Sequence, residues 1–304
     1  MTAVALVGVT ASGKSETALR LARGRGDCEI VSVDSMCVYR GMDIGTSKPG
    51  PEARAAVRHH LLDLVDPDED FTVTQFQRAA REALAGIERR RHHALLVGGT
   101  GLYLRAVVDD LAIPGRYPDV AAALEAQLDD GLATTADLHA RLAALDPVGA
   151  ARMEPTNRRR VLRALEVTLG SGHPFSTFGP GLEDYPATGM AQVGLAVPSD
   201  EIDRRIEARF GHMVEAGLVE EVQALAARPA GLSRTARQAL GYREILAHVE
   251  DGAPLDDCLE EALRHTRQFA RRQASWFRRD PRVTWAGSSA EAQTVLDRAL
   301  AVHG

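Results

Sequence analysis

The residues best suited to chemistry lie near the N-terminus, where eight residues fit the spacing GxxxxGK(S/T) directly behind the apolar run Ala3 to Val7. In such a loop the glycines let backbone N–H groups converge on an anion, the lysine adds a positive charge, and the serine hydroxyl can bind Mg²⁺. A helix expected over residues 16–23 would point its positive end at the same place. The pattern predicts a polyphosphate site, for a nucleotide such as ATP or for the diphosphate of another molecule, built from Gly8, Val9, Thr10, Ala11, Ser12, Gly13, Lys14 and Ser15.

A carboxylate follows the next apolar segment. Residues 29–33 have the composition of a buried strand, and Asp34 comes directly after it. Because ligands of open α/β sheets bind at the carboxyl ends of the strands, Asp34 is a candidate for chemistry beside the phosphate loop. The other interpretation, an aspartate that caps a helix or closes a turn, stays open at this point.

Three further segments complete the first half of the chain. Residues 36–49 have neither helical nor strand periodicity and indicate an ordered functional loop. Residues 59–65 predict another strand, in which the adjacent His59 and His60 would face opposite ways and would not share a metal ion. The strand expected over 94–97 ends in Gly98 to Gly101, where many nucleotide hydrolases carry a Mg²⁺-ordering aspartate and this chain has none.

The length and the order of these patterns predict the domain organisation. At 304 residues the chain exceeds the usual domain size of about 100 to 200, so we expect one core with a second lobe. Strand and helix patterns alternate at both ends of the chain, whereas the middle shows helical patterns alone. We therefore expect an α/β fold, a P-loop-containing parallel sheet flanked by helices, with a helical insertion domain. The expected divisions are 1–114 for the first part of the core, 115–188 for the insertion, and 189–304 for the second part with a C-terminal basic helix.

Composition excludes some classes of protein. The net charge of -6 argues against a protein that coats nucleic acid through its overall charge, and leaves local basic patches open. No apolar run approaches the ~18 residues of a membrane helix, and the chain begins with a core strand instead of a signal peptide. The three cysteines form no CxxC pair, which is typical of the reducing cytoplasm. We expect a cytoplasmic protein that is not bound to a membrane.

Arginines gather in three places. The cluster at 152–163 is equally consistent with a solvated helix face and with a surface that contacts phosphates. Arg205 and Arg209 share one row with Glu201 on a predicted helix, so an ion pair within that helix is the plain alternative to a functional role. The helix expected over 255–279 interleaves arginines with aromatic residues, which favours an anionic polymer as partner. That row is Arg264, Arg267, Arg271 and Arg278.

Seven motifs, in order along the whole chain, resemble those of the bacterial tRNA dimethylallyltransferase family, also called isopentenyl-tRNA transferases. The first is generic and the full set is highly specific. They are GVTASGKS at residues 8–15, SVDSMCVYRGMDIGTSKP at 32–49, LLVGGTGLY at 95–103, NRRRVLRALEV at 157–167, RIEARF at 205–210, ALGYRE at 239–244 and RRQASWFRRD at 271–280.

The resemblance implies transfer of a dimethylallyl group from its diphosphate to N6 of adenosine 37 of tRNA. The phosphate loop would then hold the donor's diphosphate instead of ATP, and no water would need ordering by a strand-end aspartate. By matching positions, Asp34 would be the general base, Thr100 would contact the reacting centre, and Ser15 would bind Mg²⁺. Lys14 and Arg205 would neutralise the departing diphosphate.

The same resemblance implies a set of contacts to the anticodon stem-loop of tRNA. The expected partners are thus tRNA and dimethylallyl diphosphate, with the chain acting as a monomer. Two positions depart from the family pattern, since Cys37 stands where many members have glutamine and Ala121 where members often have an RNA-contacting arginine. The expected RNA contacts are Asp34, Ser35, Met36, Cys37, Thr100, Arg159, Arg160, Arg163, Gln238, Gly241, Tyr242, Arg243, Arg271, Arg272, Gln273 and Arg278.

Two other functions were weighed against the transferase. A small P-loop kinase of the nucleoside or shikimate kinase kind also has a carboxylate after its second strand, but it would turn over ATP without RNA. The ending Gly98-Gly99-Thr100 and the C-terminal arginine row favour the transferase. A non-catalytic RNA-binding protein on a P-loop scaffold is the third possibility, and the presence of Asp34, Lys14 and Thr100 argues against it.

Overall fold

The computed structural model describes residues 2–179 and 181–301, and its centre is a six-stranded sheet in the order β3-β2-β4-β1-β5-β6. All neighbouring strands are parallel, so their carboxyl ends meet at one edge. The prediction of an α/β fold with a parallel sheet is confirmed. The strands are β1 (Ala3–Val7), β2 (Cys28–Val33), β3 (His59–His60), β4 (His93–Gly98), β5 (Ala191–Leu195) and β6 (Val283–Ala286).

The helices separate the strands along the chain, as parallel pairing requires. Short 3-10 turns occur at Phe175–Phe178 and Ala236–Gln238. In the part of the chain that the structure describes, every helix is too short or too polar to span a bilayer. The helices are α1 (Lys14–Arg25), α2 (Pro51–Ala56), α3 (Val73–Arg89), α4 (Gly101–Val108), α5 (Pro118–Asp129), α6 (Thr135–Leu145), α7 (Pro147–Ala151), α8 (Arg158–Ser171), α9 (Ser199–Glu215), α10 (Leu218–Ala226), α11 (Tyr242–Asp251), α12 (Leu255–Arg279) and α13 (Ser289–Ala301).

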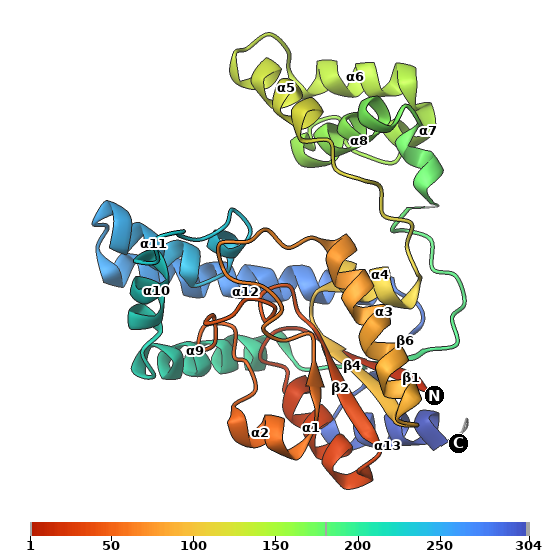
Figure 1. The fold of residues 1–304 in the computed structure, drawn as a ribbon, viewed down its shortest axis with the longest axis vertical. Coiled ribbons are helices and arrows are strands. Elements are labelled where there is room, and N and C mark those ends of the chain that lie inside the picture. Colours follow the sequence, from red (N-terminus) through yellow and green to blue (C-terminus); the bar gives the residue numbers. More distant parts are fainter. Residues whose placement is uncertain (1, 180, 302–304) are drawn as a thin grey trace. The chain divides into compact units, whose positions relative to one another are not determined.

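Helices cover both faces of the sheet (Figure 1). Side chains alternate along β1, so Leu6 packs with α1 and α13 while Ala5 and Val7 face the side of α3. The central strands β1 and β4 are buried on both faces, which explains why residues 3–7 and 94–97 are apolar throughout instead of alternating with polar residues. The two layers leave the carboxyl edge of the sheet as the place where loops from β1, β2 and β4 meet.

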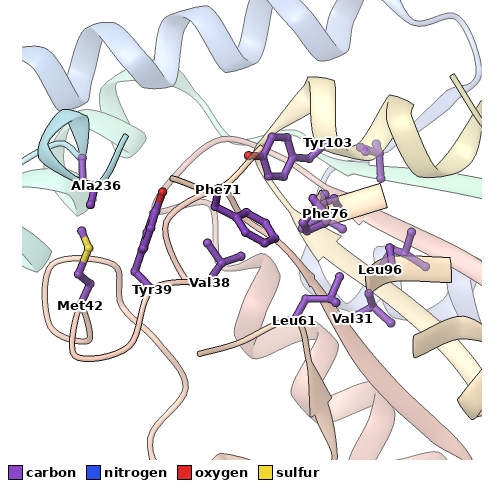
Figure 2. Close-up of a cluster of buried hydrophobic side chains, with 14 of the residues drawn as sticks. Val31, Val38, Tyr39, Met42, Leu61, Phe71, Phe76, Leu96, Tyr103 and Ala236 are labelled. Carbon is purple, nitrogen blue, oxygen red and sulfur yellow. The ribbon is translucent and has the colours of Figure 1, made fainter. Parts of the chain in front are cut away.

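The larger core also holds the functional loop that follows β2. Figure 2 shows Val38, Tyr39 and Met42 from this loop in the same apolar cluster as Phe76 of α3 and Leu96 of β4. Tyr39 and Met42 are completely buried. Although the segment has no regular secondary structure, it packs as part of the core. This packing fixes the residues at its two ends.

The chain divides into two compact units, one formed by the residues up to Asp109 and from Ala187 onward, the other by Asp110–Pro186. Residues 115–186 of the helical segment predicted for 115–188 lie in the second unit, which begins at Asp110. Its own core joins α5, α6 and α8 through Leu124, Leu142 and Leu165, all buried. Asp146 is buried beside them and accepts hydrogen bonds from Gly149 N (2.8 Å) and Ser176 Oγ (2.6 Å), which ties α7 to the following 3-10 turn.

The strand predicted over residues 59–65 is wrong in length, because β3 ends at His60. Leu61 (φ 64°) and Asp63 (φ 54°) adopt left-handed conformations that a strand cannot accommodate. Leu61 nevertheless enters the core, and Val65 forms an isolated bridge with Tyr39. The apolar residues of this segment pack as a loop, which explains why their pattern resembles that of a strand.

Candidate active site

The phosphate loop connects the carboxyl end of β1 to the first turn of α1. Gly13 (φ 90°) and Ala11 (φ 60°) have left-handed backbones, which glycine adopts freely and alanine only with strain. A Cβ atom on Gly8 would lie 2.9 Å from Ser12 Oγ, so the loop closes tightly at its base. The Ser12 hydroxyl is buried and has no hydrogen-bond partner within the described residues. An anion held by the loop would supply that partner.

Lys14 lies across this loop and donates to Val9 O at 3.0 Å. Burial, followed by the nearby charge of Arg209, lowers the pKa of Lys14 to about 8, while the charge of Asp34 opposes the change. Burial and the charge of Arg209 together outweigh the charge of Asp34 at this ammonium group. A bound diphosphate would relieve this imbalance, which makes the loop suited to a polyanion.

Helix α9 brings two arginines to the loop. Arg205 Nη1 lies 3.4 Å from Ser12 O, and its Nε forms an ion pair of 2.7 Å with Glu201 Oε1 on the same helix. The ion pair expected within the helix is present, and the same guanidinium also reaches the backbone of the phosphate loop. The functional role of Arg205 stays a prediction. One turn further along α9, Arg209 donates to Thr10 Oγ1, and burial lowers the pKa of its guanidinium although Asp34 opposes this.

Asp34 stands directly after β2 and closes a turn. Its Oδ1 accepts hydrogen bonds from Met36 N (2.8 Å) and Cys37 N (3.3 Å). The next residue along, Ser35, donates its N–H to Thr100 Oγ1 at 3.3 Å, which joins the ends of β2 and β4. The aspartate is thus a turn residue and also lies near Lys14 and Arg209, whose charged forms it favours.

The glycines at the end of β4 make room for other parts of the core. A Cβ on Gly98 would lie 2.0 Å from Val33 O, and one on Gly101 would lie 2.0 Å from the Trp276 indole nitrogen. A Cβ on Gly99 would lie 2.2 Å from the Gln273 amide nitrogen. Helix α12 occupies the space in which a side chain after this strand would stand. The missing strand-end aspartate therefore has a steric reason.

The functional loop after β2 is held by the polar side chains of Lys48 and Glu221. Lys48, whose side chain is 1% exposed, donates to Asp63 (2.6 Å) and Asp43 (2.8 Å). Glu221 accepts from the N–H groups of Asp43 (3.0 Å) and Ile44 (2.8 Å). Lys48 therefore fixes the loop and does not face the phosphate loop as Lys14 does.

A magnesium ion would find one suitable ligand here. The exposed Ser15 begins α1 beside Lys14, and its hydroxyl is the hard oxygen donor that Mg²⁺ prefers. Mg²⁺ commonly takes one or two protein oxygens and completes its shell with phosphates and water. Among the described residues, no cluster of three or more His, Cys, Asp or Glu side chains is arranged to bind a metal.

Comparison with known proteins shows the family of this chain. The IPP transferase family matches residues 37–280. The chain belongs to this family. The tRNA dimethylallyltransferase of Streptomyces coelicolor is 45% identical over 295 residues, which cover 97% of this chain and 93% of that one. The enzyme of the same name from Kineococcus radiotolerans is 48% identical over 288 residues, or 93% and 89%.

Solved structures agree. The tRNA isopentenylpyrophosphate transferase of Bacillus halodurans superposes with a TM-score of 0.71 at 35% identity and covers 99% of this chain and 97% of its own. A eukaryotic dimethylallyltransferase acting on tRNA has a TM-score of 0.78 at 24% identity, which shows the shared fold. The resemblance drawn from the seven motifs is confirmed, and the kinase is not favoured.

Residues 34–37 and Thr100 have been described above, and the other expected RNA contacts comprise an exposed group, a buried group and the half-buried Arg163. The exposed group comprises Arg159 and Arg160 on α8, Gln238 and Arg243 around the start of α11, and Arg271, Arg272 and Arg278 on α12. Arg163 is half-buried, and its guanidinium already has partners within the protein: it donates to Pro114 O (2.8 Å) and pairs with Glu166 (2.7 Å).

The second group is buried. Tyr242 is completely buried, and its hydroxyl donates to Glu221 at 2.5 Å. Because Glu221 accepts from the backbone of the functional loop, Tyr242 helps to fix that loop. Gly241 is buried and has φ 85° at the start of α11. Gln273 is 7% exposed and bonds to two backbone groups of this site. Their assignment to RNA stays a prediction, and the structure gives the side chains of Tyr242 and Gln273 partners inside the protein.

The family departures lie in different surroundings. Cys37 is buried, and its Sγ lies 3.7 Å from Thr46 O. Burial first, and then the charge of Asp34, hold the pKa of this thiol well above its usual range. The thiol is therefore neutral and serves as a small core group. Ala121 is a partly buried residue of α5.

Arg209 is a site residue to which the sequence alone assigned no role. It shares its row with Arg205 on α9, and that spacing was the available signal. An ion pair with Glu201 was the plain alternative for this row of arginines. In the structure Glu201 pairs with Arg204 and Arg205, which leaves Arg209 to contact the phosphate loop. Only the three-dimensional structure brings Arg209 to Thr10, Lys14 and Asp34.

Proposed function

We propose that the protein transfers the dimethylallyl group from dimethylallyl diphosphate to N6 of adenosine 37 in tRNA, which gives N6-(dimethylallyl)adenosine and diphosphate. The observation that carries this proposal is one carboxylate, Asp34, near a cationic phosphate loop that also receives Arg205 and Arg209. A base and an anion site at one sheet edge suit the transfer of a group away from a diphosphate.

The donor diphosphate would lie in the phosphate loop. Its charge grows as the C–O bond to the dimethylallyl group breaks, so cations nearby stabilise the transition state more than the ground state. Lys14, Arg205 and Arg209 are placed for that task. Mg²⁺ held by Ser15 would neutralise further charge on the diphosphate oxygens.

The acceptor nitrogen would approach from the side of Asp34. N6 forms its bond to the allylic carbon and passes one proton to the Asp34 carboxylate, so the product base is neutral and diphosphate leaves with the electron pair of the broken bond. The Asp34 turn is held by two backbone N–H groups and tied to Thr100, which fixes the carboxylate before the base arrives. Thr100 would contact the reacting centre from the end of β4.

The adenine must leave its stack to reach this edge, because N6 of a stacked anticodon-loop base is shielded by its neighbours. Unstacking costs a few kcal/mol. Contacts from the exposed arginines of α8 and α12 to the tRNA backbone would offset that cost. The monomeric state and the cytoplasmic location stay predictions.

The direct test incubates the protein with dimethylallyl diphosphate, Mg²⁺ and unmodified tRNA. Nucleoside mass spectrometry of the digested tRNA should reveal N6-(dimethylallyl)adenosine, and mapping of fragments should place it at position 37. A parallel reaction with ATP in place of the prenyl donor should release no phosphate. Phosphate release without RNA would instead favour a kinase.

A further inference from the structure

Gln273 connects two parts of the active site that are far apart in the sequence. Its side-chain oxygen, Oε1, accepts a hydrogen bond from Thr10 N at 2.8 Å, and its Nε2 donates to Gly99 O at 2.9 Å. Thr10 belongs to the phosphate loop, and Gly99 precedes Thr100 at the end of β4. The side chain is 7% exposed, so both bonds are shielded from water.

The position of Gln273 on α12 follows from helical spacing. Ala270, Gln273 and Phe277 lie three and four residues apart and form the buried face of the helix. Arg271, Arg272 and Arg278 are exposed on the same helix. One helix thus presents arginines to solvent and a glutamine to the phosphate loop.

Thr10 is held from two helices. Gln273 of α12 fixes its backbone N–H, and Arg209 of α9 donates to its side-chain oxygen. The adjacent Ala11 has the strained left-handed backbone of the loop. Strained conformations persist only where the surroundings fix them, and these two bonds do so at the neighbouring residue.

We propose that Gln273 is a positioning residue that holds the donor loop in its diphosphate-binding shape, and that it is not a contact to tRNA. The proposal rests on the proposed function, because it takes the loop to be the diphosphate site. A prearranged loop binds without first ordering its backbone, so loss of the glutamine should weaken donor binding. The family resemblance predicts the opposite, a loss of tRNA binding.

The test compares Gln273→Met, which keeps the length of the side chain and removes both hydrogen bonds, with Arg272→Met on the exposed face of the same helix. Inorganic diphosphate binding with Mg²⁺ is measured by calorimetry, and tRNA binding without donor by filter retention. Because the freed loop must be ordered again on binding, Gln273→Met should weaken diphosphate binding by about tenfold, while its tRNA affinity stays within twofold. Arg272→Met should show the reverse pattern.

The kinetic signature separates positioning from general destabilisation. Gln273→Met should raise KM for dimethylallyl diphosphate by about the same factor and leave KM for tRNA unchanged. Thermal unfolding checks that the variant is folded. If it is not, Gln273→Glu keeps the acceptor for Thr10 N and sets an oxygen against Gly99 O, and it should also weaken diphosphate binding alone.

Weaker tRNA binding with unchanged diphosphate binding in either variant would overturn the proposal, as would unchanged binding of both. Failure of the proposed function is a separate result, seen when the unmutated protein neither binds diphosphate nor modifies tRNA.

Discussion

A carboxylate lies at each end of strand β2, and the two differ in the groups that surround them. At the amino end, Glu29 is buried and receives both Arg90 nitrogens at 2.7 Å, together with His60 Nε2 at 2.6 Å. Burial opposes its ionisation, and the hydrogen bonds from Arg90 and His60 outweigh burial, so the pKa of Glu29 falls to about 2. The charges at this end satisfy one another.

At the carboxyl end, Asp34 bonds to backbone N–H groups, and the nearby cations bond elsewhere. Lys14 donates to Val9 O and Arg209 to Thr10 Oγ1, and burial is the main reason that the pKa of each is lowered. These charges are crowded and are not neutralised by one another. At the amino end, charges that pair with one another stabilise the fold. At the carboxyl end, charged groups that bond to backbone and hydroxyl groups are available to substrates.

Removal of the carboxyl-end charge should have the largest effect. Asp34→Asn keeps an oxygen that accepts from Met36 N and so preserves the turn, but the amide cannot take the proton from N6. Single-turnover rates should fall by about 10² to 10⁴, with tRNA affinity within a small factor. Asp66→Asn, at an exposed ion pair with Arg40, is the matched control and should react normally. A variant that binds tRNA poorly yet reacts at the normal rate once saturated would make Asp34 a binding residue.

Loss of a loop cation should come next. Lys14→Ala, Arg205→Ala and Arg209→Met should each slow the chemical step by roughly 10², because each charge acts most strongly on the departing diphosphate. Arg204→Ala removes an exposed arginine from the same helix and should change the rate by less than twofold. Unchanged single-turnover rates in any of the first three variants would contradict the role assigned to that residue.

The amino end should show the opposite behaviour. Glu29→Gln should lower the free energy of unfolding at pH 7 by about 2 kcal/mol, less than the full pKa change implies since Arg90 is partly exposed, and leave kcat unchanged. A lowered pKa means that the stabilisation is complete above the ordinary value of 4.5 and disappears as the pH falls towards 2. Denaturant melts from pH 7 to 3 should therefore converge for the variant and the parent.

The control for Glu29 is Glu52→Gln, at an exposed pair with Arg23, which should unfold like the parent at every pH. Equal stability of Glu29→Gln and the parent at pH 7 would show that the amino-end cluster does not stabilise the fold.

The smallest effect concerns exposed arginines. Each phosphate contact contributes about 0.7 to 0.9 to the slope of log affinity against log salt. Arg159→Ala with Arg160→Ala, or Arg271→Ala with Arg278→Ala, should thus flatten the slope by about 1.5 and leave diphosphate binding unchanged. Arg163→Ala should instead destabilise the unit that holds it, because its partners are Pro114 O and Glu166. Salt slopes that match the parent in both double variants would place the RNA surface elsewhere.

Much of this site could be predicted because its signals are local. The phosphate loop depends on eight consecutive residues, and Asp34 was assigned from its position after a short apolar run. Helix α12 begins and ends at the residues that its periodicity predicts, 255 and 279. The prediction that the strand continues beyond His60 is wrong for a local reason too, since nothing in the apolar pattern reveals the left-handed backbone at Leu61.

Residue types, their spacing and the family could be read from the sequence, because motifs and periodicity act over a few neighbouring positions. Which of these residues meet depends on tertiary packing. Thr10 and Gln273, which share a hydrogen bond, are 263 positions apart, and Lys48 pairs with Asp63, 15 positions away. Such pairings depend on how helices pack against the sheet edge, and packing selects partners by shape and burial that no single stretch of sequence contains.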